Sequence, residues 1–531
     1  MTTRPFSSVL VANRGEIAVR VLREARASGR RAIAVCSDAD ADALHVREAD
    51  EAVRIGPAAA AQSYLNVEAI LDAAKRTDAE AIHPGYGFLS ENAAFAQAVT
   101  DAGLVWIGPP PAAIEAMGDK ARAKRLMIEA GVPTVPGWQG DAQDGAALKS
   151  EAAKIGYPLL IKAVAGGGGR GMRVVRSGAE FDEALASARR EAKSAFGDDA
   201  VLLEKFVERG RHVEIQVFAD AHGNTIHLGE RDCSAQRRRQ KVIEEAPSPA
   251  VSGDLRARMG ADAVAAAKAV TYAGAGTVEF LLDDDGAYYF LEMNTRLQVE
   301  HPVTEEVTGL NLVQLQFDVA AGKPLPISQD DVALNGWSVE LRLYAEDPYD
   351  GFAPQSGRIA WFEPEASGVR VDTGVVTGDR IGTEYDAMVA KLIGTGPTRD
   401  AALDRLRAAL RSAPLLGVTT NRDFLLALID DPRFRAGEIT TGDLDRWSEE
   451  ASGPFSPRDV AFDALALGAA LLCDPRRPVL RSGSVTRFDL DVEANADRTT
   501  LTVEQMRDGG VIVRQGAAQV EIAILDLPDG R

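Results

Sequence analysis

An α/β fold with several domains is predicted by three features of this sequence. In the N-terminal part, strand-like apolar runs alternate with helical stretches, a pattern typical of a parallel sheet covered by helices on both faces. The apolar fraction, 46%, is that of an ordinary globular protein. At about 100 to 200 residues per domain, a length of 531 residues predicts three to five domains, each with its own core.

The chain begins with a Rossmann-like unit. Residues 8–12 predict a buried strand and residues 13–15 a turn, and an amphipathic helix follows. Further strands are predicted at 32–36, 79–82 and 104–107. The first turn lacks the G-x-G-x-x-G pattern, so a dinucleotide site is disfavoured.

The pattern changes at several later points. From about residue 119 to 325, a helix and short strands lead into a glycine run and a hairpin-rich stretch, and residues 338–447 mix strands with a helix. Residues 447–457, rich in Ser, Glu, Gly and Pro, predict a linker. Residues 458–531 predict the beginning of a β-rich domain rather than a whole one. Its strand-like runs are 487–492, 499–503, 510–514 and 518–525.

Charge and composition disfavour several classes of function. Lys and Arg number 59 against 79 Asp and Glu, which gives a net charge of −20, and the isoelectric point is about 4.9. Coating nucleic acid requires a basic face, so no nucleic-acid partner is expected. Three scattered cysteines favour a reducing, cytoplasmic location. The longest apolar run, 464–473, is about half the roughly 20 residues that span a bilayer, and no signal peptide is visible, so no membrane segment is expected.

The clearest local signal is a glycine run after a predicted strand. Gly166 to Gly169 lie between Lys162 and Arg170. Consecutive glycines let the backbone approach a ligand and aim N–H groups at phosphate oxygens, while the two cations add charge. The run is not a Walker A loop, because no Gly-Lys-Ser/Thr follows. A phosphate-binding loop is predicted; the alternative is a flexible linker.

A β-hairpin that carries two glutamates is the second signal. Residues 277–282 and 287–294 predict two strands around an Asp-Gly turn. A two-residue loop places Glu279 and Glu292 directly opposite, a four-residue loop makes them diagonal neighbours, and a three-residue loop separates them across the sheet. Like charges side by side call for a divalent cation, and Asn294 offers a third oxygen. The alternative is a pair of solvated glutamates on an exposed sheet face.

A third signal follows this hairpin directly. Arg296, Gln298 and Glu300 occupy alternate positions, so an extended segment would project them to one side. A guanidinium, an amide and a carboxylate together indicate a small-anion site with a base beside it. An ordinary salt-bridged turn is the alternative.

The densest basic stretch of this acidic chain lies at residues 230–241. It has no interleaved aromatic residues and lies between strand patterns, so a nuclear signal or nucleic-acid patch is disfavoured. Contact with phosphate or another anion within a site is predicted. A solvated charged strand is the alternative.

Six motifs in order resemble the biotin carboxylase module of biotin-dependent carboxylases, which are ATP-grasp enzymes. The resemblance covers about residues 7 to 446. With the added C-terminal segment, the chain is similar to acyl-CoA carboxylase α-subunits of the propionyl-, methylcrotonyl- and geranyl-CoA type. The motifs are residues 11–18, 83–92, 117–120, the glycine run, 231–234 and 292–305.

The resemblance also implies a domain layout. Its parts are an N-terminal Rossmann-like subdomain at 1–118, an ATP-grasp domain at 119–330 with a mobile lid at about 135–205, a mixed α+β C-terminal subdomain at 331–446, the linker at 447–457, and the incomplete start of a β-rich subunit-coupling domain at 458–531.

The activity implied by the resemblance is ATP-dependent carboxylation of biotin by bicarbonate through carboxyphosphate. Mg²⁺ or Mn²⁺ would bind Glu279, Glu292 and Asn294. The nucleotide would be held by Lys120, Lys162, Gly166, Gly167, Gly168, Gly169, Glu204, Val207, His212, Gln236, Arg239 and Leu281.

Bicarbonate would be bound by Lys241 and Arg296, with help from Gln298 and the Val299 backbone. In the same way, the resemblance implies three further roles. Glu300 would be the base that deprotonates bicarbonate, Arg342 would stabilise the biotin enolate, and Tyr86 would lie near the biotin or nucleotide rim.

Two departures from the family pattern qualify this expectation. Arg239 stands where the family usually has a histidine, which adds a permanent charge beside the phosphate site. No Ala-Met-Lys-Met occurs, so biotin would come from another domain or chain. The partners implied are a biotinylated carrier, a carboxyltransferase β-subunit and a homo-oligomer or α/β hetero-oligomer. The competing hypotheses are another ATP-grasp ligase acting on a small metabolite and a nucleotide-binding assembly subunit.

Overall fold

The computed structural model divides the chain into two compact units, Met1–Phe455 and Ser456–Arg531. No helix among the described residues is both long and apolar enough to cross a membrane. The structure describes residues 5–138, 140, 142–164, 172–364, 368–412, 415–456, 460–473, 485–494, 497–506 and 510–523.

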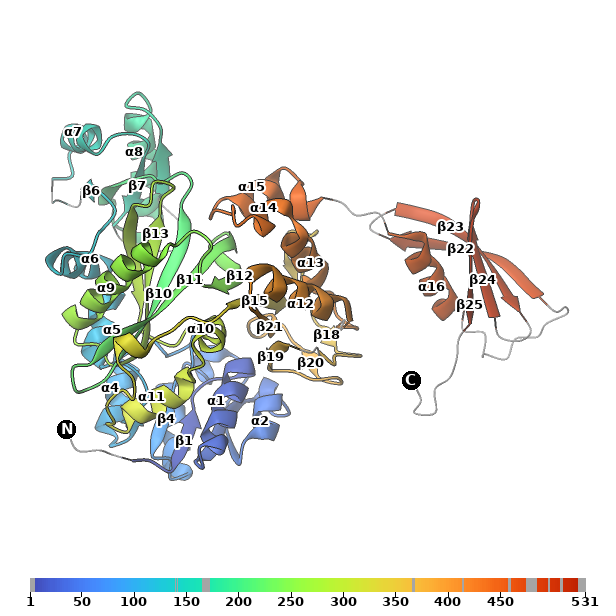
Figure 1. The fold of residues 1–531 in the computed structure, drawn as a ribbon, viewed down its shortest axis with the longest axis horizontal. Helices are drawn as coiled ribbons and strands as arrows, with labels where there is room; N and C mark the ends of the chain where they lie inside the picture. Colours follow the sequence, from blue (N-terminus) through green and yellow to red (C-terminus); the bar gives the residue numbers. More distant parts are fainter. Residues whose placement is uncertain are drawn as a thin grey trace. The chain divides into compact units, whose positions relative to one another are not determined.

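The first unit begins with a parallel five-stranded sheet in the order β3-β2-β1-β4-β5, which confirms the predicted α/β start (Figure 1). Helix α1 packs on one face and α3 and α4 on the other. Strand β3 was missed because Glu51 and Arg54 interrupt its apolar pattern. The elements are β1 (Ser8–Val11), α1 (Gly15–Ala27), β2 (Arg31–Ser37), α2 (Leu44–Glu48), β3 (Glu51–Gly56), α3 (Val67–Arg76), β4 (Ala81–His83), α4 (Ala93–Asp101) and β5 (Val105–Trp106).

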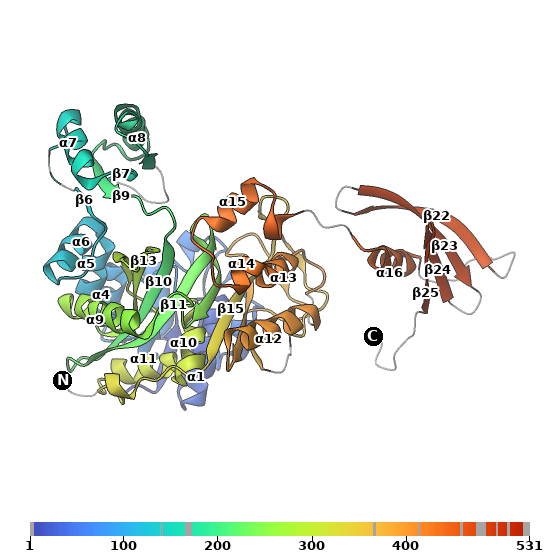
Figure 2. The same ribbon diagram turned by 45° about the horizontal axis from the view of Figure 1, so that its top comes forward.

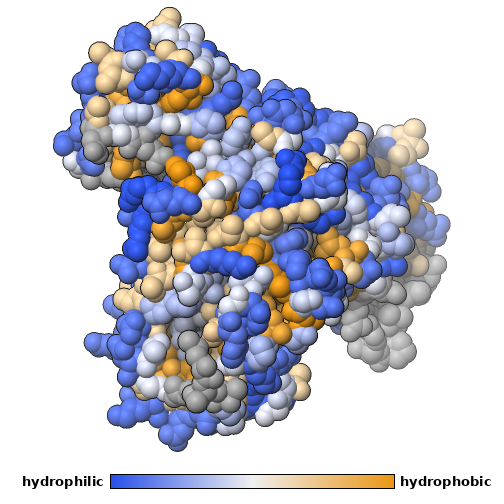
Figure 3. All heavy atoms as spheres, turned by 60° about the vertical axis from the view of Figure 1, so that its left-hand side comes forward, coloured by the Kyte–Doolittle hydropathy of each residue, from blue (hydrophilic) through white to orange (hydrophobic). Residues whose placement is uncertain are grey.

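A small antiparallel sheet in the order β6-β9-β7-β8, with two helices, forms a separate lobe at the top of Figure 1. Its own core includes Leu148, Leu159, Phe181 and Leu203. Figure 3 shows the surface hollowed below this lobe. The preceding helices and the elements of the lobe are α5 (Pro111–Gly118), α6 (Lys120–Glu129), β6 (Gly137–Trp138), α7 (Gly145–Ile155), β7 (Leu159–Ala163), β8 (Met172–Val175), α8 (Phe181–Phe196) and β9 (Val201–Lys205).

An eight-stranded sheet crosses the middle of the unit in the order β14-β13-β10-β11-β12-β15-β21-β19 (Figure 2). It joins the central and C-terminal parts of the unit into one surface. Its elements and the adjoining helices are β10 (Arg211–Ala219), β11 (Thr225–Arg237), β12 (Gln240–Ala246), α9 (Gly253–Ala269), β13 (Gly274–Leu282), β14 (Tyr288–Asn294), α10 (His301–Thr308), α11 (Leu312–Ala320), β15 (Trp337–Tyr344), β19 (Val369–Thr373) and β21 (Met388–Gly396).

The two faces of this sheet differ in chemistry. On β10, Val213, Ile215 and Val217 pack in one apolar core with helix α9. Successive strand residues point to opposite faces, so His212 and Glu214 face the other side. Helix α10 packs over β11, β12, β15 and β21 on that polar side. The central sheet therefore has an apolar α9 face and a polar α10 face.

The C-terminal part of the first unit packs helices on β15 and β21. Its core includes Leu341, Leu392, Leu406 and Phe424. The elements are β16 (Glu346–Asp347), β17 (Ala353–Pro354), β18 (Gly357–Arg358), β20 (Arg380–Ile381), α12 (Arg399–Ser412), α13 (Arg422–Asp430), α14 (Pro432–Arg435) and α15 (Asp443–Glu449).

The second unit is an antiparallel four-stranded meander that packs against helix α16. The four strand-like runs predicted for this region are strands over their described residues, and residues 524 and 525 of the last run lie outside these. The helix occupies the apolar run that is too short to span a bilayer. The elements are α16 (Phe462–Leu472), β22 (Val485–Ala494), β23 (Asp497–Met506), β24 (Gly510–Gln515) and β25 (Ala518–Ala523).

Candidate active site

Charged side chains follow one another across the α10 face of the central sheet. Glu292 on β14 is opposite Glu279 on β13, and Glu279 is opposite Glu214 on β10. On its other side, Glu214 is opposite Arg231 on β11. Buried charges are stable only when they are paired, so this row demands compensating cations.

Glu279 and Glu292 lie opposite each other because of a β-bulge. The strands close over a three-residue loop, since the Asp283 amide donates to the Ala287 carbonyl at 2.7 Å. Such a loop alone would separate the two glutamates across the sheet. A register shift between Glu279 and Phe280 inserts one residue on β14 and returns both glutamates to one face. The direct pairing that the sequence analysis allowed for a two-residue loop is therefore present, but it arises from a three-residue loop combined with a bulge.

The Lys241 ammonium lies at the centre of the carboxylates. Its Nζ is 2.5 Å from Glu300 Oε1, 2.7 Å from Glu214 Oε2 and 3.3 Å from Glu279 Oε1. Burial disfavours a charged lysine, but the surrounding negative groups outweigh it and hold the pKa of Lys241 well above its usual value. The ammonium therefore stays protonated and is available to an anion.

Glu300 directly precedes α10 and is fully buried. Its Oε2 lies 3.2 Å from a guanidinium nitrogen of Arg342, which also binds Glu244 through Nε at 2.6 Å. Burial alone would raise the pKa of Glu300, but Lys241 and Arg342 outweigh it and lower the pKa well below its ordinary value. At neutral pH the carboxylate is ionised, which is the state a base requires.

Glu214 is a second buried carboxylate and is electrostatically coupled to Glu300. Its Oε1 accepts a hydrogen bond from Arg231 Nε at 2.5 Å. Burial and the charge of Glu300 raise the pKa of Glu214 in spite of Arg231. Two neighbouring carboxylates whose pKa values are pushed apart take different roles. Glu214 therefore holds a proton more readily, and Glu300 carries the negative charge.

Arg296 is oriented by three side chains next to this cluster. Its Nε donates to Glu91 at 2.8 Å, and its two terminal nitrogens lie 3.1 Å from Gln298 Oε1 and 3.3 Å from Asn294 Oδ1. Gln298 Nε2 is buried without a hydrogen-bond partner. An unpaired buried donor beside a guanidinium is suited to an anion.

The residues predicted to bind nucleotide form ion pairs at the lobe and beside the hairpin. Lys162 on β7 pairs with Glu204 on β9, and Lys124 Nζ reaches the same carboxylate at 2.8 Å. Burial raises the pKa of Glu204, but the two ammonium groups outweigh it and lower the pKa overall. Lys120 Nζ lies 3.6 Å from Glu292 Oε2. Gly166 to Gly169 lie outside the described residues.

Other predicted nucleotide residues are distributed around the β10–β13 end of the sheet. His212 Nε2 lies 2.9 Å from Glu279 Oε2, and although burial lowers the pKa of His212, this carboxylate raises it overall. Gln236 is opposite Lys241 in the β11–β12 hairpin. Arg239 at the hairpin turn instead reaches the lobe, where its guanidinium donates to Met172 Sδ at 3.3 Å.

Two apolar residues and a tyrosine complete the predicted set. The Leu281 and Val207 side chains both lie against Gly210, so a Cβ there would meet Leu281 at 2.4 Å. The Tyr86 hydroxyl donates to Glu16 on α1. Tyr86 is thus tied to helix α1 of the N-terminal subdomain.

Several residues of the cluster were not singled out from sequence. Glu214 had a local signal, since it follows His212 by two positions in an otherwise apolar strand. Glu91 and Arg231 lie inside the family motifs 83–92 and 231–234 but were given no role there, and the remaining residues reach the site from parts of the chain that no local pattern marks. These missed residues are Glu91, Lys124, Glu214, Arg231, Glu244 and Lys391.

The three side chains predicted to hold a divalent cation are compatible with one. Glu279, Glu292 and Asn294 supply oxygen atoms on one face of the hairpin, and Asn294 Nδ2 donates to Glu279 Oε1 at 2.6 Å. Two carboxylates and an amide oxygen are hard ligands of the kind that Mg²⁺ and Mn²⁺ prefer. The residues present therefore suit such a cation.

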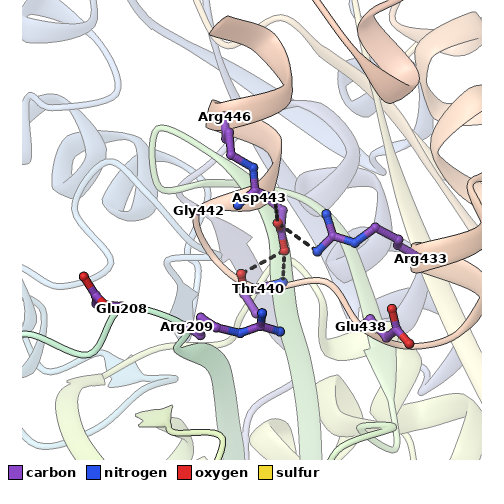
Figure 4. A pocket seen from close by; sticks show the side chains of 8 residues that line it. All are labelled: Glu208, Arg209, Arg433, Glu438, Thr440, Gly442, Asp443 and Arg446. Carbon is purple, nitrogen blue, oxygen red and sulfur yellow. Dashed lines mark hydrogen bonds and ion pairs between the residues drawn. The ribbon is translucent and has the colours of Figure 1, made fainter. Parts of the chain in front are cut away.

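A cavity of about 530 Å³ lies between the 208–209 loop and helices α14 and α15 (Figure 4). Asp443 accepts hydrogen bonds from Arg433 at 3.0 Å and from the Thr440 hydroxyl at 2.8 Å. Three carboxylates and three guanidinium groups line it and balance each other. The lining residues are Glu208, Arg209, Arg433, Glu438, Thr440, Gly442, Asp443 and Arg446.

Three family models together match most of the first unit. They are the biotin carboxylase N-terminal domain over residues 5–114, the ATP-binding domain of the carbamoyl-phosphate synthase L chain over 119–328, and the biotin carboxylase C-terminal domain over 340–446. With the site described above, these matches define the class of protein: the chain belongs to the biotin carboxylase family.

Individual relatives narrow this class. The chain is 52% identical over 471 residues to the mitochondrial methylcrotonoyl-CoA carboxylase subunit alpha of Dictyostelium discoideum, covering 88% of this chain and 67% of that protein. It is 52% identical over 440 residues to the biotin carboxylase of a Nostoc species, covering 82% of this chain and 98% of that protein. The chain thus spans about two thirds of the carboxylase α-subunit and nearly all of the free-standing biotin carboxylase.

A solved structure shows the same fold. The biotin carboxylase domain dimer of Hydrogenobacter thermophilus 2-oxoglutarate carboxylase, in complex with MgADP, ADP and bicarbonate, has a TM-score of 0.78 and 47% identity. The similarity covers 86% of this chain and 100% of that one. The predicted α/β architecture is therefore confirmed for the first unit.

Proposed function

We propose that this chain carboxylates biotin with bicarbonate in an ATP-dependent reaction that passes through carboxyphosphate, as the biotin carboxylase component of an acyl-CoA carboxylase. The observation that carries the proposal is the buried contact of Glu300 with both Lys241 and Arg342. It places an ionised base between two cations in a site that has oxygen ligands for a divalent cation on one side and an oriented guanidinium on the other.

Bicarbonate binding and activation are assigned to the anion end of the site. Lys241 and Arg296 hold the anion, with the free amide nitrogen of Gln298 and the Val299 backbone beside them. Glu300 takes the bicarbonate proton, so that the oxygen can attack the γ-phosphorus of ATP. Its lowered pKa keeps it ionised before the substrate arrives.

Nucleotide binding is assigned to the other end of the site. Lys162 and Lys120 contact phosphates, and Glu204, Val207 and Leu281 surround the adenine. Glu279, Glu292 and Asn294 would hold Mg²⁺ or Mn²⁺, and such a cation offsets charge on the transferring phosphoryl group. The small lobe acts as a lid that excludes water when it closes over ATP.

Carboxylation of biotin is assigned to Arg342. The guanidinium stays charged and has a fork geometry suited to the enolate oxygen of biotin. Biotin is delivered by a carrier on another domain or chain, and the second unit belongs to the region that couples this chain to a carboxyltransferase β-subunit. Residues Cys36, Cys233 and Cys473 are free thiols, which supports a reducing compartment such as the cytoplasm.

A phosphate-release assay tests this function. Purified protein should cleave ATP in the presence of bicarbonate and Mg²⁺ only when free biotin is added. Equal turnover without biotin would indicate another ATP-grasp ligase, and absence of turnover with retained ATP binding would indicate a nucleotide-binding assembly subunit. Both outcomes would contradict the proposal.

A further inference from the structure

Lys391 is a fully buried lysine at the junction of three parts of the first unit. It lies on β21, and its Nζ donates to the Val299 carbonyl at 2.7 Å. The same ammonium lies 3.3 Å from Glu16 Oε1 on α1 and 3.9 Å from Asp372 Oδ2 on β19. The Lys391 ammonium therefore contacts the segment 296–300, helix α1 of the N-terminal subdomain and strand β19 of the C-terminal part.

The hydrogen bond to Val299 acts on the residue that follows it. The Val299 carbonyl and the Glu300 amide belong to one planar peptide group, so fixing the carbonyl fixes the plane from which Glu300 begins. A charge-assisted bond in a buried place is stronger and more directional than a neutral one. Through its hydrogen bond to the Val299 carbonyl, Lys391 on β21 holds the Val299–Glu300 peptide in its orientation.

The sheet places this ammonium next to the reaction centre without exposing it. Lys391 is directly opposite Arg342 on β15 and opposite Asp372 on β19. Arg342 binds the carboxylate of Glu300, whereas Lys391 binds the backbone carbonyl of the preceding residue, Val299. Burial disfavours the charged form, but Glu16 and other carboxylates raise the pKa of Lys391 overall, so it remains a cation.

We propose that Lys391 is a positioning residue for the base: it orients the Val299–Glu300 peptide so that the Glu300 carboxylate meets bicarbonate. This inference rests on the proposed function. Its competitor is a purely structural role, in which Lys391 only neutralises Glu16 and Asp372. The two roles can be distinguished in a variant that loses the positive charge of Lys391 together with the negative charge of a neighbouring buried carboxylate.

A double substitution makes that separation. Lys391→Met alone removes the bond to Val299 but also leaves the buried Glu16 carboxylate without its cation, so it should lower both the melting temperature and the activity. Lys391→Met combined with Glu16→Gln removes a charge of each sign and still leaves an acceptor for Tyr86. Glu16→Gln alone is the matched control, because it removes the carboxylate nearest to the ammonium but keeps the Val299 bond.

The readouts are melting temperature, ADP affinity, and kcat and KM for bicarbonate in biotin-dependent ATP cleavage. The double variant should regain the melting temperature lost by Lys391→Met, bind ADP normally, and keep a kcat/KM for bicarbonate reduced roughly 10- to 100-fold, as for one lost charge-assisted hydrogen bond. Glu16→Gln alone should keep a kcat/KM for bicarbonate within about threefold of wild type, because it retains the Val299 bond. Recovery of kcat/KM in the double variant together with its melting temperature would overturn the proposal.

A crystal structure of the double variant provides a readout that does not need activity. The Val299–Glu300 peptide should rotate or occupy more than one orientation once the ammonium is gone. An unchanged peptide would overturn the positioning role even if the wild-type protein failed to cleave ATP. Failure of wild-type turnover with a rotated peptide would instead contradict only the proposed function.

Discussion

The two ends of the active site are built from the same kinds of ion pair in opposite environments. At the nucleotide end, the Lys120 and Glu292 side chains are 76% and 47% exposed, and their charged groups are 3.6 Å apart. At the anion end, Glu214 and Glu300 are fully shielded from solvent and share the Lys241 ammonium at 2.7 and 2.5 Å. Glu292 of the loose, exposed pair and Glu214 of the tight, buried network thus lie on strands of one sheet that are separated only by β13.

This difference indicates how each end handles its ligand. Exposed ion pairs contribute about 0 to 1 kcal/mol and can be exchanged for contacts with ATP phosphates at little cost. Removing one partner of a buried ion pair lowers the free energy of unfolding by several kcal/mol, so a buried pair keeps a fixed geometry. We infer that the nucleotide end adapts when the lid closes, whereas the anion end is preorganised.

Substitution of the base should give the largest effect. Glu300→Gln keeps the shape of the side chain but cannot accept the bicarbonate proton, so biotin-dependent ATP cleavage should fall by about 10²- to 10⁴-fold. Isothermal titration should still show ADP binding, since Glu300 lies at the anion end. Loss of ADP binding would mean that the two ends are not separable as described.

Removal of the central cation should give the largest loss of stability. Lys241→Met leaves Glu214, Glu279 and Glu300 without their shared ammonium, and we expect a loss of about 3 to 5 kcal/mol in the free energy of unfolding. Chemical denaturation measures this change. A variant as stable as wild type would show that the network at this end is not tightly coupled.

The stability of the protein should also depend on pH through His83, which is buried at the end of β4 and hydrogen-bonded to Gln316. Burial lowers the pKa of His83 to about 4 from its usual 6.5, so the unfolded chain binds a proton that the native state does not. His83 should thus contribute about 3 kcal/mol of stability above pH 6.5 that is lost as the pH falls towards 4.

Denaturation between pH 4 and 7 checks the His83 prediction against His83→Asn, which retains an acceptor for the Gly85 amide. The difference in stability between wild type and variant should shrink as the pH falls. A difference that is constant with pH would exclude His83 as its source.

The smallest expected effect on stability is at the nucleotide end. Lys120→Met breaks an exposed ion pair, so the free energy of unfolding should change by less than about 0.5 kcal/mol. The KM for ATP should nevertheless rise severalfold, because a cation near the phosphates is lost. Thermal denaturation and initial rates measure the two quantities. A loss of stability comparable to that of Lys241→Met would erase the contrast between the ends.

Much of the fold could be predicted from periodicity. The alternation of strands and helices in the N-terminal sheet and the four strands of the second unit follow from local hydrophobic patterns. Strand β3 is not predicted because charged residues interrupt its apolar pattern. Helix α16 is not predicted because its apolar run, 464–473, was weighed only as a membrane segment. A local hydrophobic pattern indicates which face of a helix or strand is buried. It does not predict an element whose two faces both carry apolar and charged residues.

The site could be predicted in part, because its residues were recognisable as motifs. Lys241, Arg296, Glu300 and Arg342 converge as the family resemblance implies. Glu244 and Lys391 could not be found in this way, since each lies in a strand whose importance comes from its neighbours in the sheet. The pairing of Glu279 with Glu292 is one of the arrangements that the sequence leaves open, but the bulge that produces it beside a three-residue loop is not visible in the residue pattern.

The sequence by itself determined the class of protein, the order of its motifs and the kinds of chemical group available, because these depend on residue type and spacing along the chain. Only the tertiary structure decided which charges are buried, which carboxylate is ionised and that Lys391 holds the carbonyl before the base. The physical reason is that the strength of a charge depends on its distance from other charges and on its exposure to water, and both are set by strands far apart in sequence.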